Sequence, residues 1–181
     1  MPDGLNKIFF ILLIIQQSAI CNGKSNFGSS LVYMNASYNP DTLSHFKYNH
    51  YDVKGKARIF YEIQFKETLT RLTLHASVDM LRADNWRLNL GAVSLDMCRL
   101  SELYKSKNRL VKIFVKELLR VSNYRDCPTF PNKTIIVKNY TVDPDLFPSF
   151  TPSTYWICQL HFAVGKVDYF STFLKGKFYN L

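Results

Sequence analysis

The sequence predicts a mainly β fold, an antiparallel β-sandwich of about eight strands that carries one amphipathic helix. Residues 58–66 and 71–80 alternate strictly between apolar and polar side chains, which is typical of strands with one buried and one wet face. Helical spacing of apolar residues is clear only between Cys98 and Cys127. A parallel α/β fold needs helices between its strands, so these patterns favour antiparallel sheets.

The first 21 residues have the features of a secretory signal peptide. Lys7 is the only positive charge before an apolar run over residues 8–15, and small residues suited to cleavage follow. The run is shorter than the roughly 20 apolar residues that cross a bilayer. We therefore expect a secreted protein in which residues 22–30 are a loose N-terminus and residues 31–181 form one domain.

Turn signals divide that domain into strand segments. The turns are expected at Asn39-Pro40-Asp41, Lys54-Gly55-Lys56, Asp84-Asn85 and Gly165-Lys166. The short link 67–69 predicts a hairpin between 58–66 and 71–80. The remaining strands are expected at 31–38, 43–51, 86–97, 134–141, 156–164 and 167–174.

The helix is expected over residues 110–119. Asn108 is a plausible N-cap and Asn123 a plausible stop. Lysines and arginines fill the side opposite the apolar stripe, and such a helix can also rest on a membrane. We favour packing against a sheet, because a domain of this size needs the cover.

The cysteines predict one disulfide and one free thiol. Cleavage after Cys21 leaves Cys98, Cys127 and Cys158, whereas cleavage after Ala19 would keep all four. We favour the pair Cys98–Cys127, which would contribute about 3 to 4 kcal/mol by restricting the unfolded chain. Pairing of Cys127 with Cys158 stays open.

Surface features fit a secreted glycoprotein. Glycosylation sequons begin at Asn35, Asn132 and Asn139, and the formal net charge is +9. That charge favours an anionic membrane surface or a receptor as partner. In a secreted protein we do not expect nucleic acid.

Signatures of catalysis and metal binding are missing from the sequence. There is no C-x-x-C, H-E-x-x-H or G-x-S-x-G motif, no glycine-rich phosphate loop and no distinctive carboxylate pair. We expect a non-enzyme without a metal or cofactor.

Aromatic residues are abundant, with 14 Phe, 11 Tyr and 2 Trp. They predict either a very full core or a core that opens around an apolar ligand. Because protein interiors normally pack without voids, physics alone favours the full core.

An ordered set of short motifs adds a resemblance. It consists of Leu95-Asp96-Met97-Cys98-Arg99-Leu100, the amphipathic helix, Cys127-Pro128, Ile135-Ile136-Val137 and Leu146-Phe147-Pro148. Over roughly residues 56–175, the chain resembles the large insect family of secreted proteins that includes the CheB-like chemosensory proteins. That family is related to the ML lipid-recognition domains, among them the ganglioside activator. The chain departs from it in lacking N-terminal cysteines and in having Cys158 without an obvious partner.

The resemblance implies an immunoglobulin-like sandwich whose sheets part to hold a lipid. We predict a secreted binding protein for a lipid or other small hydrophobic ligand, with a pheromone-related, chemosensory role. One alternative is a secreted interaction protein with a filled core, acting as a co-receptor or as an immune or reproductive accessory factor. Another is a cofactor that lifts lipid from membranes for a hydrolase. The candidate cavity residues are Tyr61, Phe65, Leu72, Leu74, Phe114, Leu118, Trp156, Leu160 and Phe162, with Phe147 and Phe150 at the mouth.

Overall fold

The computed structural model describes residues 27–53, 56–81, 86–131, 133–141 and 153–180. The predicted signal peptide, the glycosylation site Asn132 and the mouth residues Phe147 and Phe150 lie outside these residues. The predictions made for them stay predictions.

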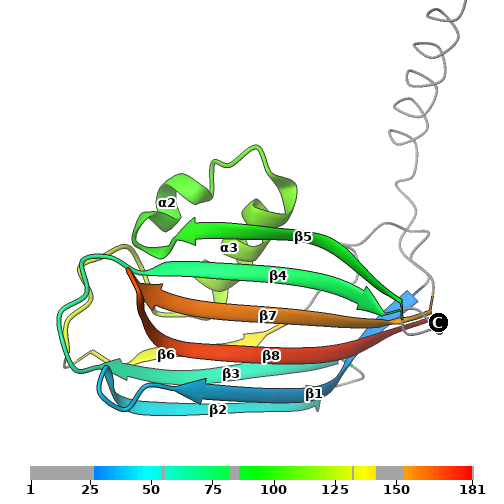
Figure 1. Ribbon diagram of the computed structural model, residues 1–181, viewed down its shortest axis with the longest axis horizontal. Helices are drawn as coiled ribbons and strands as arrows, with labels where there is room; N and C mark the ends of the chain where they lie inside the picture. Colours follow the sequence, from blue (N-terminus) through cyan, green and yellow to red (C-terminus); the bar gives the residue numbers. More distant parts are fainter. Residues whose placement is uncertain (1–26, 54–55, 82–85, 132, 142–152, 181) are drawn as a thin grey trace, which may run out of the picture.

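Two antiparallel sheets face each other (Figure 1), which confirms the predicted β-sandwich. The five-stranded sheet has the order β1-β8-β7-β4-β5 and the three-stranded sheet the order β2-β3-β6. Their bounds are β1 Phe27–Tyr38, β2 Leu43–Val53, β3 Lys56–Phe65, β4 Thr73–Leu81, β5 Arg87–Asp96, β6 Ile135–Tyr140, β7 Tyr155–Val164 and β8 Val167–Asn180. The predicted strands are found within a few residues, except that β1 begins earlier and β8 runs further than expected.

The predicted hairpin between β3 and β4 is wrong, because these strands belong to different sheets. β3 pairs with β2 and β6, whereas β4 pairs with β5 and β7. The link between them crosses the sandwich, and Leu69 within it is buried and exchanges two backbone hydrogen bonds with Thr129. Alternation along a strand reports which face is buried and not which strand lies beside it.

One long side of the sandwich is closed by the chain itself. Between β1 and β2, the backbone N–H of Asn39 donates to the carbonyl of Tyr169 at 2.8 Å, and the Asn39 amide donates to the carbonyl of Asp168. These bonds fix the turn that carries the chain from one sheet to the other. The two sheets therefore meet along the β1–β2 side.

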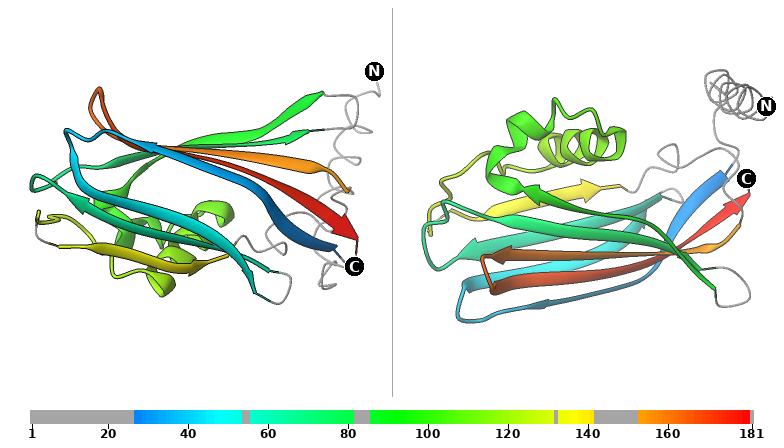
Figure 2. Two further views of the ribbon diagram at one scale, coloured as in Figure 1. Left: turned by 90° about the horizontal axis from the view of Figure 1, so that it is seen from below. Right: turned by 45° about the horizontal axis from the view of Figure 1, so that its top comes forward.

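The opposite side, between the edge strands β5 and β6, is covered by helices. η1 (Met97–Arg99) and α2 (Leu100–Leu103) follow β5, and α3 (Arg109–Val121) lies beside β6 (Figure 2). Asn108 caps α3 as predicted, since its side-chain oxygen accepts a hydrogen bond from the Val111 N–H at 3.3 Å.

Asn123 joins the end of α3 to β6. Its backbone N–H donates to the Ile136 carbonyl, its amide donates to the Thr134 carbonyl, and its side-chain oxygen accepts from the Ile136 N–H. The residue expected only to stop the helix therefore also docks it on the edge strand.

The core consists of two clusters. The larger, helix-side cluster contains residues such as Phe65, Leu100 and Val115, and the smaller cluster surrounds Trp156 and Phe178. Tyr61, Tyr140 and Leu160 pack against both clusters, so they stand at the junction between them.

Candidate ligand-binding cavity

A cavity of about 100 Å³ lies between the two sheets and reaches α3. One water needs roughly 10–15 Å³ in such a measure, so the space can hold several atoms of a ligand. The lining consists of apolar and tyrosine side chains: Ile59, Tyr61, Ile63, Phe65, Leu72, Met97, Phe114, Leu118, Tyr124, Ile135, Val137, Tyr140, Leu160, Phe162, Phe170 and Leu174.

The strand alternation brings most of the lining together. On β7, Leu160 and Phe162 face the same side as Phe170 on the neighbouring β8, because Phe162 and Phe170 are register partners with stacked rings 4.1 Å apart. On β3, Tyr61 and Phe65 share one face, because side chains four residues apart in a strand point to the same side. Leu160, Phe162 and Tyr61 point inward yet are only half-buried, and the surface they retain lines the cavity.

A bulge in β6 places Tyr140 in the lining. Tyr61 pairs with Val137 but Ile59 pairs with Tyr140, so β6 holds one residue more than β3 between these pairs. Asn139 adopts a left-handed backbone conformation with φ 63°, which Asn tolerates better than most residues. Without the extra residue, alternation from Val137 would turn Asn139 inward and Tyr140 outward.

Hydrogen bonds hold this bulge. The Tyr51 hydroxyl donates to the Asn139 side-chain oxygen at 2.6 Å. Arg58 donates to the Asn139 carbonyl and to the Thr141 hydroxyl. The Asn139 side chain is exposed and lies on the outer side of the bulge.

The described part of the lining contains no charged side chain, and its polar side chains are tyrosines. The Tyr61 hydroxyl donates to Thr172 Oγ1 at 3.0 Å and so joins the two sheets. Burial raises the pKa of Tyr61 and of Tyr140 above the ordinary tyrosine range, and it raises the pKa of the nearby Cys158 thiol to about 12. All three groups are therefore neutral at physiological pH.

The helix wall is formed by the apolar face of α3. Phe114 and Leu118 line the cavity, and the Phe114 ring lies 6.0 Å from the Tyr140 ring. On its outer side the helix carries an ion pair between Arg120 and Glu117. The prediction that α3 packs its apolar stripe against a sheet is confirmed.

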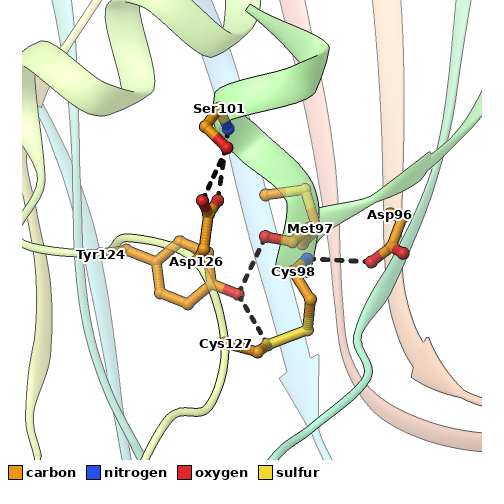
Figure 3. Close-up of a disulfide and its surroundings, with 7 residues drawn as sticks. All are labelled: Asp96, Met97, Cys98, Ser101, Tyr124, Asp126 and Cys127. Atoms are coloured by element: carbon orange, nitrogen blue, oxygen red, sulfur yellow. Dashed lines mark hydrogen bonds between the residues drawn. A yellow bond between two sulfur atoms is a disulfide. The ribbon is translucent and has the colours of Figure 1, made fainter.

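The disulfide Cys98–Cys127 lies beside this helical wall, with Cys98 in η1 (Figure 3). It joins the segment after β5 to the segment before β6, with 4.6 Å between the two Cα atoms. The Tyr124 hydroxyl donates to the Met97 carbonyl at 3.1 Å beside it. Met97 and Tyr124 both line the cavity, so the disulfide holds two lining residues in place.

The neighbouring residues explain the D-x-C-x-L motif. The Asp96 carboxylate accepts a hydrogen bond from the Cys98 N–H and caps η1. Leu100 is completely buried in the helix-side cluster. Asp126 accepts from the Ser101 hydroxyl at 2.8 Å, which ties the two disulfide-linked segments a second time. The favoured pairing is confirmed, and Cys158 is free.

Seven of the predicted cavity residues line the cavity: Tyr61, Phe65, Leu72, Phe114, Leu118, Leu160 and Phe162. Leu74 and Trp156 do not. Leu74 is completely buried within the helix-side cluster, and Trp156 is buried in the smaller cluster, where its ring lies against Gly176.

Residues that sequence reasoning missed came into the lining in three ways. Met97 and Tyr124 are brought in by the disulfide, and Tyr140 by the bulge. The other six lie on predicted strands, whose alternation could have identified them: Ile59, Ile63, Ile135, Val137, Phe170 and Leu174.

Over the described ranges, no group of three or more His, Cys, Asp or Glu side chains could hold a metal ion. His75 and His161 are direct register partners on β4 and β7 and are exposed on the outer face of the sheet. In the same part of the chain, no helix has the length and apolar character needed to cross a membrane.

These features define a two-sheet β-sandwich with an uncharged internal cavity and a disulfide-tied helical wall. Residues 74–158 match the model of a family described as "Protein of unknown function (DUF1091)". The match runs from β4 into β7 and contains the disulfide, α3 and the bulge.

Comparison with curated proteins gives no match. Among solved structures, the chain is similar to chicken MD-1, in a crystal structure of that protein complexed with lipid IVa. The identity is 11%, the TM-score is 0.42, and the superposition covers 88% of this chain and 95% of MD-1.

Proposed function

We propose that this protein is a secreted, non-enzymatic binding protein for a lipid or another small hydrophobic molecule, held between its sheets. The observation that carries the proposal is the cavity, whose lining contains no charged side chain among the described residues. Apolar cavities of this order of size stay dry and accept small apolar molecules. Burial of a ligand there would contribute roughly 25 cal/mol per Å² of apolar surface.

The same cavity separates this proposal from the alternative of an interaction protein with a filled core. A filled core would bury the inner-face residues of β7 completely, whereas Leu160 and Phe162 keep accessible surface. The excess of aromatic residues therefore supports a hollow core rather than a full one.

The test is native mass spectrometry of the secreted protein, combined with displacement of the apolar fluorophore N-phenyl-1-naphthylamine. We expect a co-purified or added hydrophobic ligand to bind wild type and to lose affinity in Leu160→Trp, which fills the cavity. Gln159→Trp is the matched control, since it adds the same ring to the outer face of the same strand. A folded wild type that binds neither ligand nor fluorophore contradicts the proposal.

A chemosensory, pheromone-related role is supported by the family resemblance of the D-x-C-x-L, helix and C-P pattern. Native mass spectra of protein expressed in insect cells would reveal the ligand class. Long-chain hydrocarbons or their oxygenated derivatives would support that role, and a phospholipid alone would contradict it.

One feature favours an anionic membrane surface as an additional partner. On the outer face of β7 and β8, the ammonium groups of Lys175 and Lys177 lie 5.1 and 5.7 Å from the centre of the exposed Tyr155 ring. Tyr33 and Phe173 form an edge-on pair on the same face. A positively charged aromatic face suits anionic head groups.

Sedimentation with vesicles tests this surface. We expect binding to vesicles of phosphatidylserine and phosphatidylcholine, weakened by added salt and by Lys175→Ala with Lys177→Ala. Equal binding to pure phosphatidylcholine vesicles would contradict a charge-based contact.

A further inference from the structure

Strand β5 leaves one edge of the larger sheet open. It is the last strand in the order β1-β8-β7-β4-β5 and forms the upper edge of that sheet in Figure 1. Among the other edge strands, β1 and β2 lie beside each other, and α3 lies beside β6. Over the described ranges, β5 pairs with β4 and with no other strand. The backbone N–H and C=O groups on its far side are therefore available to pair with another chain.

The side chains of β5 leave this edge accessible. Eight of its ten residues are exposed, and Leu88 and Leu90 are 40% and 43% exposed. Proteins that keep an edge strand from pairing usually place lysine or proline on it or shorten it. β5 contains neither lysine nor proline, and the three sequons lie outside it. The edge therefore has the composition of a pairing surface.

A bulge divides β5 into two halves. Gly91 pairs with Val78 but Asn89 pairs with Asp79, so Leu90 is an additional residue on β5. Even-numbered side chains point into the sandwich before the bulge, and odd-numbered ones do so after it. A Cβ atom built on Gly91 would meet no atom within 4 Å, so the space around the bulge is open.

The two halves of β5 are complementary to each other. A second copy can be placed antiparallel beside the first, with Arg87 opposite Asp96 of the other copy. The pairs are then a cation with an anion, two leucines, two polar residues, two apolar residues and two small residues: Arg87–Asp96, Leu88–Leu95, Asn89–Ser94, Leu90–Val93 and Gly91–Ala92. Each pair occurs twice, because the arrangement has two-fold symmetry.

The bulge makes this register possible. Residues directly opposite each other in an antiparallel pair point to the same face of the sheet. In a regular strand Leu88 and Leu95 would point to opposite faces, since an odd number of steps separates them. The bulge turns Leu95 inward, where it pairs with the buried Leu74. A bulge usually bends an edge away from other chains, but here both copies carry it at the symmetry axis, so the residue counts of the two strands stay equal.

The two ends of β5 carry its only charged side chains. The Arg87 side chain is 52% exposed and donates to Asp79 through Nη2, while Asp96 accepts from the Cys98 N–H through Oδ1. Each group therefore keeps donor or acceptor atoms for a second contact. Sliding one copy by two residues in either direction would separate Arg87 from Asp96, so the charges favour one register.

We infer that β5 is a homodimer interface, at which two copies pair antiparallel and join their five-stranded sheets into one continuous sheet. The occupant of the open edge is thus a second copy of this chain. The inference goes beyond the proposed function, because no residue of β5 lines the described part of the cavity.

Sedimentation velocity of the secreted protein over a range of concentrations tests the dimer. We expect a reversible monomer–dimer equilibrium with a dissociation constant in the micromolar range. Leu90→Lys should weaken it about tenfold or more, because it places an ammonium group beside the apolar Val93 of the other copy. Val32→Lys is the matched control and should dimerise as wild type does, since Val32 is 54% exposed on β1, the opposite edge strand of the same sheet. A wild type that stays monomeric up to its solubility limit, or an equilibrium that Leu90→Lys leaves unchanged, overturns the inference.

Solution NMR on a mixture of methyl-labelled and unlabelled protein tests the register without any substitution. Intermolecular NOEs should join the methyl groups of Leu90 in one copy to those of Val93 in the other. Intermolecular NOEs that involve other strands and leave out β5 overturn the inference. Displacement of N-phenyl-1-naphthylamine should be equal in wild type and Leu90→Lys, so failure of the dimer leaves the proposed function standing.

Discussion

The core of this protein is closed around Trp156 and open around Tyr61 and Leu160, although both regions lie between the same two sheets. At the closed end, the Trp156 ring lies directly on Gly176, where a Cβ atom would come within 2.1 Å of it. The indole N–H donates to the Ser29 hydroxyl at 3.2 Å. The large ring has room to be buried here, because its register partner has no side chain.

At the open end, no glycine lines the described part of the cavity. Tyr61 on β3 and Leu160 on β7 point their large side chains into the space between the sheets. Phe114 of α3 lines the same space from the β6 side. The disulfide and Asn123 hold that helical wall in place. The comparison indicates that the cavity is maintained by fixed walls, while the closed end supplies packing energy.

Removal of the disulfide should have the largest effect. We expect Cys98→Ala with Cys127→Ala to lower the free energy of unfolding by about 3 to 4 kcal/mol and to abolish ligand binding, because Met97 and Tyr124 lose their anchor. Urea unfolding and fluorophore displacement measure the two effects. Cys158→Ala is the control and should cost about 1 kcal/mol. Unchanged binding in the double variant would show that the wall does not need the disulfide.

Gly176→Ala should destabilise the closed end of the core and leave ligand binding at the open end nearly unchanged. The new methyl group would meet the Trp156 ring and the Ser30 carbonyl, which lies 2.5 Å from the Cβ position. Overpacking of this kind costs about 2 to 3 kcal/mol, measured by urea unfolding against the exposed neighbour variant Lys177→Ala. Ligand affinity of the folded fraction should stay within about twofold, since a change of 0.4 kcal/mol or less is expected at the open end. A larger loss would mean that the two ends are coupled.

Asn139→Ala should affect ligand binding at the open end and leave the closed end of the core unchanged. An alanine in the left-handed conformation costs about 1 kcal/mol, and relief of that strain would let Tyr140 turn away from the cavity. We expect weaker hexanol binding in Asn139→Ala and wild-type binding in Asn139→Gly, which keeps the bulge. Both variants are compared with unglycosylated wild type, so that loss of the sequon does not enter. Equal behaviour of the two variants would show that the bulge does not position Tyr140.

The smallest expected effect is on the stability of the protein at acidic pH. The hydrogen bond from Arg87, together with one from Asn89, lowers the pKa of Asp79 on the reverse face of the closed end. A lowered folded-state pKa stabilises the protein above the unfolded value of about 3.9, and this contribution is lost as the pH falls below it. Asp79→Asn should flatten that part of the pH dependence by less than about 1 kcal/mol. Identical acid unfolding curves would show that the ion pair contributes nothing.

Much of this architecture could be predicted from the sequence, because alternation on β3, β4 and β7 directly encodes which side chains point inward. Tyr61, Phe65, Leu160 and Phe162 were found in that way. Alternation does not encode neighbours, so the pairing of β3 with β4 was wrong. It also does not encode where the inward side chains leave a space, which is why Trp156 was expected in the cavity although its ring packs on Gly176 in the smaller cluster.

Three of the missed lining residues depended on features that a single sequence does not reveal. The bulge that turns Tyr140 inward follows from one backbone angle at Asn139. Met97 and Tyr124 meet only because the disulfide brings two distant segments together. Local patterns therefore predicted the sheets, while long-range constraints decided the shape of the space between them.

The central claim, that a hydrophobic ligand occupies the space between the sheets, is tested most directly by solution NMR on methyl-labelled protein. Intermolecular NOEs from bound 1-hexanol should reach the methyl groups of Leu118, Val137 and Leu160, one from each wall of the cavity. NOEs confined to exposed apolar residues such as Val32 and Leu90 would place the ligand on the outside and contradict the account.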